Sequence, residues 1–358
     1  MTQAAIILMS TSYLILALML ILHVYIGLRT LLLGIALPAE AEQDAAVRGI
    51  RRNYAALTSS LAVVVGGACF FWMRQQPERG FLCWATAILL LVMGSGFAIR
   101  IGRMSAQRLK AARGWQVAVP TKRAASITIG RTQGSVLSAW WYSAHAAVMA
   151  LCIFAAIARW DAIPQGFATF LGDHYASKSV WTVFAMNIVQ AMTIALFVFI
   201  HLMIGRARMS VDPLDREGSL HKQLKRKRIY SILALGASLL IIGFHGVIQA
   251  ITLYGWEENL LFYSGLSLWL ALFLGMVGVM LYQRIKGLDQ FRDIPSQEDR
   301  HWKWLGSIYV NPEDPALIVP DRHGFAWTIN MANPRSKVII AAAIAVLVMV
   351  NVIYINFV

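Results

Sequence analysis

Eight stretches of roughly 20 predominantly apolar residues recur along the chain, and they constrain the fold more than any other feature. They run at about 4 to 27, 55 to 73, 81 to 101, 135 to 158, 180 to 203, 230 to 254, 261 to 282 and 337 to 357. Inside a bilayer every backbone amide must be satisfied within its own element, so stretches of this length form transmembrane helices. Only 14% of the residues are charged, far fewer than in a soluble domain. We therefore predict an all-α polytopic membrane protein with about eight transmembrane helices.

The distribution of lysine and arginine predicts the orientation. The segments after the first, third, fifth and seventh apolar stretches hold 28 of the 32 basic residues. Basic residues near helix ends resist translocation, so these segments face the cytoplasm and both termini lie outside. This pattern predicts a bacterial cytoplasmic (inner) membrane. The net charge of +14 then reports topology and does not indicate nucleic-acid binding. The run LKRKR at 224 to 228 is an additional candidate for contact with anionic membrane lipids.

Two segments resemble each other and predict an internal repeat. Each begins with a histidine before Ile-Gly, at His23 and His201, and each reaches a basic pair followed by one residue and a tyrosine, at Tyr54 and Tyr230. We interpret this as a parallel three-helix repeat. The predicted organisation is a first repeat unit at 1–134, helices four to seven at 135–282 with an outer loop at 159–179, a cytoplasmic β-rich segment at 283–336 and a last helix at 337–358.

Few polar residues lie within the predicted spans, and none of them is acidic. The missing carboxylates disfavour an ion-coupled transporter and an intramembrane acid–base pair. A shared polar cavity between helices four, five and six is one interpretation of the remaining groups; hydrogen bonds that hold the helices together are the other. These groups are His145, Asn187, Gln190, His245 and Gln249.

Catalytic and metal-binding motifs are missing from the sequence. It has no P-loop, GxSxG, HExxH or CxxC pattern. The three cysteines lie inside separate apolar runs, where we expect neither a disulfide framework nor a zinc site. We therefore predict no catalytic residue, no metal and no cofactor, and interpret the chain as non-enzymatic. An enzyme that uses His145 or His245 as a base is the weakest alternative.

Two segments outside the membrane are candidates for recognition. The loop from Arg159 is the longest outward loop, at about 21 residues, and its candidate contact residues are Pro164, Gly172, Asp173 and Lys178. On the cytoplasmic side the short apolar runs SIYVN, ALIVP and FAWTINM are separated by turn residues. They predict a small juxtamembrane β-meander. Its candidate motif comprises Tyr309, Asn311, Pro312, Asp314 and Arg322.

These two segments also carry a family resemblance. Ile163-Pro164, Phe167, Gly172, Asp173 and Lys178-Ser179 resemble a bacterial membrane-protein family of unknown function that includes the toxin-immunity protein SdpI. Gly166 stands where that family has a histidine, so a histidine-dependent role of the loop is in doubt. The motif Y-x-N-P-x-D-P from Tyr309 looks like a second uncharacterised domain that often accompanies the first. The resemblance implies resistance to an envelope-active peptide and defines no catalytic residues.

The sequence leaves three functions open. The leading hypothesis is recognition of an envelope-active peptide or lipid-like ligand, in immunity or sensing, with a cytoplasmic or membrane protein partner. The second is a transporter or lipid-handling permease whose pathway lies between the repeats. The third is an accessory subunit of a larger membrane complex.

Overall fold

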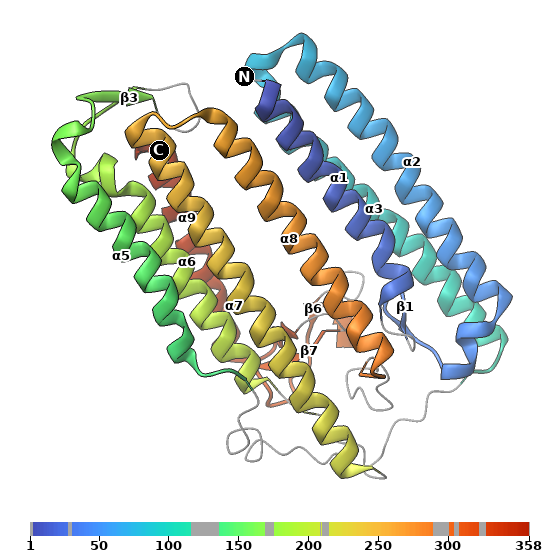
Figure 1. Ribbon diagram of the computed structural model, residues 1–358. Coiled ribbons are helices and arrows are strands. Elements are labelled where there is room, and N and C mark those ends of the chain that lie inside the picture. Colours follow the sequence, from blue (N-terminus) through green and yellow to red (C-terminus); the bar gives the residue numbers. More distant parts are fainter. Residues whose placement is uncertain are drawn as a thin grey trace. The chain divides into compact units, whose positions relative to one another are not determined.

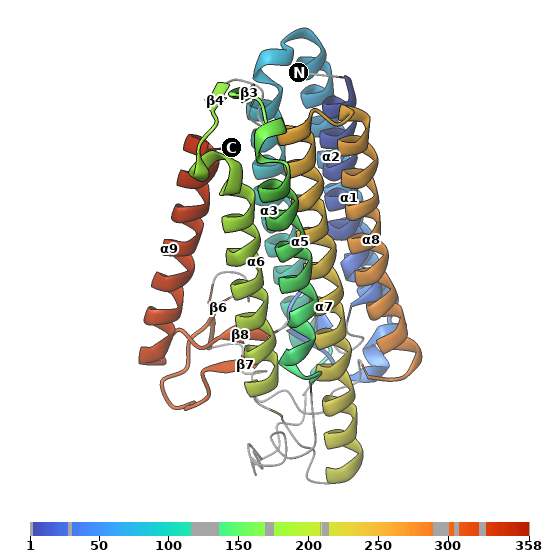
Figure 2. The same ribbon diagram turned by 60° about the vertical axis from the view of Figure 1, so that its left-hand side comes forward.

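The computed structural model describes residues 3–27, 31–115, 136–168, 175–207, 209, 215–288, 301–303, 308–321 and 327–357. Within these residues the chain is mostly helical, with short antiparallel strand pairs between the helices (Figures 1 and 2). The α-helices are α1 (Gln3–Ile26), α2 (Ala45–Gln75), α3 (Gly80–Ala112), α5 (Ser143–Ala158), α6 (Val180–Arg206), α7 (Arg216–Tyr254), α8 (Glu258–Ile285) and α9 (Pro334–Phe357).

The prediction of a helical, multi-pass membrane protein is confirmed at this level. Seven helical spans among the described residues are long and apolar enough to cross a membrane, judged by length and composition. They lie at α1, α2, α3, α5 with the 3-10 turn before it, α6, α7 and α8. Helix α9 occupies the eighth predicted stretch, and its crossing stays a prediction. So do the bacterial inner membrane and the outward termini.

The chain divides into two compact units. Unit 1 comprises Met1–Gln133, Arg206–Arg226 and Phe273–Pro334, and unit 2 comprises Gly134–Gly205, Lys227–Leu272 and Arg335–Val358. The domain boundaries that we derived from the sequence stay a prediction. Each unit is described below by itself.

In unit 1, helices α1, α2 and α3 pack along one another, and glycines set their closest contacts (Figure 1). The short 3-10 helix η2 (Pro77–Arg79) turns the chain so that α3 returns along α2. A Cβ atom on Gly66 would lie 2.6 Å from Tyr13 Cε1, and one on Gly94 would clash with Leu61. Glycine therefore lets α1 and α3 approach α2 more closely than any other residue would.

A hairpin between α1 and α2 was not predicted. Strands β1 (Leu31–Leu32) and β2 (Ile35–Ala36) pair antiparallel around Leu33 and Gly34, which both have positive φ, at 48° and 80°. This is the conformation of a tight two-residue hairpin turn, which a leucine rarely adopts. The Leu33 side chain is buried against Gly102 of α3, so burial offsets the backbone strain. The apolar segment LLLGIALP thus forms a buried hairpin on the helices.

Unit 2 contains α5, α6 and most of α7. A short 3-10 helix, η3 (Ala139–Tyr142), precedes α5, and another, η4 (Trp160–Ala162), follows it. The loop toward α6 contains an antiparallel hairpin of strands β3 (Gly166–Ala168) and β4 (Tyr175–Ser177). A buried cluster of apolar side chains attaches this hairpin to the ends of α5, α6 and α7. It consists of Ala156, Ile163, Phe167, Val183 and Leu253.

Strands form at the three predicted cytoplasmic runs, but they do not form a meander. Strands β5 (Trp302–Lys303) and β6 (Ile308–Tyr309) pair antiparallel, as do β7 (Ile318–Pro320) and β8 (Trp327–Ile329). A parallel bridge between Tyr309 and Asn330 joins the two pairs, and β6 does not pair with β7 within the described residues. The reason is the Asn311-to-Asp314 turn, whose polar groups bind the end of β8.

Candidate functional site

Three of the predicted intramembrane residues meet in unit 2 as a cluster of amide side chains. Asn187 Nδ2 donates to Gln190 Oε1 at 2.9 Å and to Gln249 Oε1 at 3.2 Å. Gln249 Nε2 donates back to Asn187 Oδ1 at 2.8 Å. Asn187 and Gln190 lie on α6 and Gln249 lies on α7, so the cluster joins two consecutive helices.

Backbone and sulfur atoms satisfy the remaining donors of these amides. Gln249 Nε2 also donates to the Val183 carbonyl at 3.3 Å. Gln190 Nε2 donates to the Ile242 carbonyl at 3.1 Å and contacts Cys152 Sγ at 3.6 Å. All three amides are buried, and each amide nitrogen has two partners. This arrangement suits helix packing, because a transport or binding site would keep polar groups available for a ligand.

His145 does not join the amide cluster. Residues 136–138 are not helical and Ser138 caps the 3-10 turn η3, so His145 falls in the first turn of α5 instead of the middle of a helix. Its Nε2 atom lies 2.7 Å from Ser238 Oγ of α7. Gln190 contacts Cys152, which follows His145 by seven residues on α5. At 1.5 Å rise per residue, Cys152 lies about 10 Å further along the helix axis than His145. Counted along the predicted helices from the cytoplasmic side, His145 and Gln190 are expected at similar depth, and these contacts show that this expectation is wrong.

His145 instead belongs to an aromatic group at the start of α5. The ring of His145 lies 4.7 Å from the ring of Tyr142. The ring of His201, on α6, lies 5.5 Å from the ring of Tyr142. Tyr142 donates to the Phe197 carbonyl, and His201 Nε2 bonds the Leu137 carbonyl at 2.8 Å. These contacts hold the segment before α5, which includes η3, against the last turns of α6.

His245 also stands apart from the amides. It lies on α7, and its Nδ1 atom is buried with no hydrogen-bond partner among the described residues. The described residues contain no group of three or more histidine, cysteine or acidic side chains that could hold a metal ion. His245 therefore has no described partner for acid–base or metal chemistry.

In the loop between α5 and α6, Lys178 has a structural role. Its ammonium group donates to the Trp160 and Ile163 carbonyls, at 2.5 and 3.1 Å, and lies over the Trp160 ring. Its backbone N–H bonds the Gln165 carbonyl at 2.8 Å. Lys178 thus anchors the β3–β4 hairpin to η4. Pro164 is exposed, and Gly172 and Asp173 lie outside the described residues.

The predicted cytoplasmic motif is the polar core of the C-terminal strand pairs. Tyr309 donates to Asp314 Oδ2 at 3.0 Å and accepts from Asn311 Nδ2 at 3.1 Å. Asn311 and Asp314 also accept backbone N–H groups of their own turn, those of Glu313 and Ala316. These three side chains are buried, whereas Pro312 is exposed. The motif therefore holds the turn together, and Arg322 lies outside the described residues.

Asn330 is the residue in this motif that we did not single out as a site. Its side chain accepts from the N–H groups of Asn311 and Ala332, and donates to the carbonyls of Asn311 and Asp314. The sequence contains a weak signal, because a lone asparagine lies one residue before the end of the apolar run FAWTINM. Polar residues in that position are often buried and bonded to the backbone.

The basic run 224–228 is partly folded into the protein. The guanidinium of Arg226 lies 5.6 Å from the Trp327 ring in unit 1, and Lys225 lies 5.7 Å from the Tyr282 ring. In unit 2, Lys227 donates to the Gly205 carbonyl at 3.0 Å. Arg226 and Lys227 are buried. Of this run Arg228 is exposed, and its contact with anionic lipid stays a prediction.

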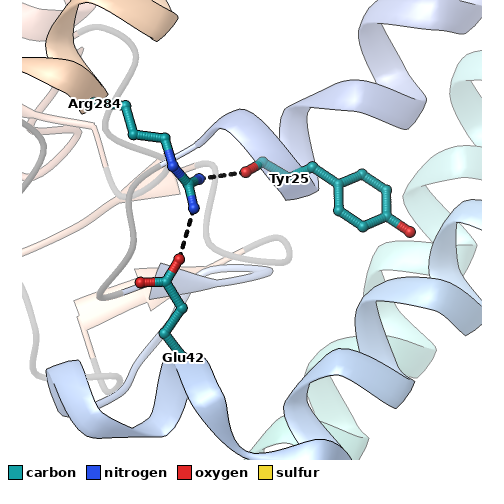
Figure 3. A network of polar contacts seen from close by, with 3 residues as sticks. All are labelled: Tyr25, Glu42 and Arg284. Atoms are coloured by element: carbon teal, nitrogen blue, oxygen red, sulfur yellow. Dashed lines mark hydrogen bonds and ion pairs between the residues drawn. The ribbon is translucent and has the colours of Figure 1, made fainter.

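Arg284 connects three segments of unit 1 (Figure 3). From the last turn of α8 it donates to the Tyr25 carbonyl at the end of α1 and to Glu42 Oε1 at 2.6 Å. Glu42 lies in the 3-10 helix η1 (Ala39–Gln43) that precedes α2. The contact thus connects the linker between α1 and α2 to the end of α8.

We expect the Arg284–Glu42 pair to contribute about 1 kcal/mol of coupling. The two side chains are 28% and 26% exposed, so solvent screens them only in part. A double-mutant cycle with Arg284→Gln and Glu42→Gln measures this coupling free energy. Each variant is unfolded in detergent at two salt concentrations. Arg113 and Asp44, 3.1 Å apart with Arg113 55% exposed, are the matched control and should couple less. Equal coupling in both pairs would contradict this.

One comparison with known proteins found a match. A model described as a family of unknown function (DUF5808) matches residues 312–337, which include Asp314 and Asn330. The match concerns that segment, which lies partly within the predicted second uncharacterised domain. No curated protein and no solved structure matches the chain. The resemblance of the outer loop to the SdpI family stays a prediction.

Proposed function

We propose that this protein is a non-enzymatic membrane protein whose β3–β4 hairpin recognises an envelope-active peptide or a lipid-like ligand, in immunity or sensing. The observation that carries the proposal is a contrast within unit 2. The buried amides of Asn187, Gln190 and Gln249 hydrogen-bond one another. The hairpin that Lys178 anchors, in contrast, leaves Pro164, Gln165 and Gly166 exposed. Exposed loops on a rigid support are where recognition residues usually lie.

The surroundings of the hairpin suit an amphipathic ligand. Val180 and Trp181 follow β4 and are 59% and 66% exposed. Exposed tryptophan at a helix start is typical of the membrane interface, where amphipathic peptides and lipids accumulate. The anchor at Lys178 reduces the ordering entropy that binding would otherwise cost. The resemblance to the SdpI family points the same way.

The test is protection of cells against membrane-active peptides. We expect cells that express the protein to survive a several-fold higher concentration of at least one peptide of a broad panel. Asp173→Ala should remove protection, because the proposal makes this residue a contact of the ligand. Lys178→Met should also remove it, because methionine keeps the length of the side chain but cannot donate to two carbonyls. Lys286→Met, at an exposed residue of unit 1, is the control and should protect fully.

Two outcomes would contradict the proposal. The first is equal sensitivity of expressing and non-expressing cells to every peptide of the panel, with no ligand or partner recovered on gentle purification. The second is full protection by Asp173→Ala and Lys178→Met at normal expression levels. The alternatives predict other results: flux in reconstituted vesicles for a transporter or permease, and a stoichiometric protein for an accessory subunit. We also propose that the chain contains the parallel three-helix repeat and that strands β5 to β8 lie on the cytoplasmic side.

A further inference from the structure

Two of the three cysteines lie in contact in unit 1. Cys69 of α2 and Cys83 of α3 are 14 positions apart, and their sulfur atoms lie 3.3 Å from each other. Cys83 Sγ also lies 3.6 Å from the Cys69 carbonyl. The expectation of no disulfide framework stays a prediction, but the sequence did not indicate that two of the thiols meet. The turn at η2 folds α3 back on α2, and it brings together residues that belong to separate apolar runs.

We propose that Cys69 and Cys83 form an oxidation site, at which a reversible disulfide locks α2 to α3. A disulfide has a sulfur–sulfur distance of about 2.05 Å, so the thiols must approach by about 1.3 Å. We expect rotation about the Cα–Cβ bonds of the two side chains to supply this shift. Both thiols are free in the structure.

The oxidant is a disulfide of a small thiol or of a protein, and the step is an exchange. Cys83, the more accessible thiol, loses its proton and attacks one sulfur of the donor disulfide, which releases a first thiol. Cys69 then loses its proton and attacks the Cys83 sulfur of this mixed disulfide, which releases a second thiol. The two protons end on the two released thiols. The donor gains two electrons and the cysteine pair loses them.

The position of the pair suits this chemistry. Cys69 lies six residues before the end of α2 and Cys83 lies three residues after the start of α3, so both are near η2 at one end of the α2–α3 hairpin. The predicted orientation places this end outside the cytoplasm, where disulfides persist. The bond would fix the buried cluster that α1 shares with the hairpin, which includes Tyr13, Met73 and Leu91. Oxidation is therefore expected to raise the thermal stability of unit 1.

The test uses the full-length protein in lipid nanodiscs, treated with oxidised glutathione and then with reductant. Mass spectrometry of unreduced peptides should find the Cys69–Cys83 link in the wild type and in Cys152→Ser. The link should be absent from Cys69→Ser and Cys83→Ser. The unfolding midpoint of the wild type should rise by several degrees on oxidation and return on reduction. Cys152 contacts Gln190 in unit 2, so it is an internal control.

Three results would overturn the proposal. One is a Cys83–glutathione adduct that never resolves to the link. Another is a link to Cys152 in equal yield. The third is a fully reduced pair after acid trapping and alkylation in living cells. Each measurement on the wild type stands even if a serine variant fails to fold.

Discussion

Asn330→Ala is expected to unfold the C-terminal strand pairs. The Asn330 side chain is 0% exposed and makes four hydrogen bonds to backbone groups, at 3.0, 3.2, 2.8 and 2.9 Å. Alanine would leave two N–H and two carbonyl groups buried without these partners. An unsatisfied buried group costs about 1–3 kcal/mol, so the loss is on the order of 4 kcal/mol or more. A cluster this small cannot withstand that loss.

Amide hydrogen exchange of the purified protein measures this effect. Protection of residues 308–333 should fall to the level of an unfolded segment, while protection of α2 and α3 should not change. Glu313→Ala is the matched control, because its exposed side chain lies in the same turn. Unchanged protection in Asn330→Ala would show that the strand pairs do not depend on this residue.

Asn187→Leu should lower the free energy of unfolding of the protein by about 2 kcal/mol. The substitution removes three hydrogen bonds among the buried amides and leaves groups of Gln190 and Gln249 unpaired. Interhelical hydrogen bonds in membranes contribute about 0.6 kcal/mol on average and up to about 1.7 kcal/mol. Unfolding in a detergent titration gives the value. Thr193→Val, which removes one bond within α6, is the control and should cost much less.

The triple variant Asn187→Leu, Gln190→Leu, Gln249→Leu separates packing from function. Replacing all partners with apolar groups of similar size can be nearly neutral for stability. If the amides only hold α6 to α7, the triple variant should be more stable than Asn187→Leu and should keep its protective activity. A triple variant that folds but loses activity, or loses flux in vesicles, would favour the transporter alternative.

The candidate site was only partly predictable from the sequence. The depth count from the cytoplasmic side pairs Asn187 with His245, but in the structure Asn187 bonds Gln249, one helical turn beyond His245. The same arithmetic failed for His145, because the start of the apolar run is not helical and the depth count began too early. Asn330 was overlooked because a lone asparagine in an apolar run is a weak signal, which does not show whether its side chain bonds backbone atoms or solvent.

The sequence by itself determined where the helices lie. Hydropathy and backbone satisfaction act within one segment, so each predicted stretch coincides with a helix over most of its length. Only the tertiary structure decided which side chains meet. It placed the thiol of Cys69 beside that of Cys83, Gly94 against Leu61, and Arg284 between Tyr25 and Glu42. Such contacts depend on how helices rotate and approach in three dimensions, and that information is spread over the packing surfaces of several segments.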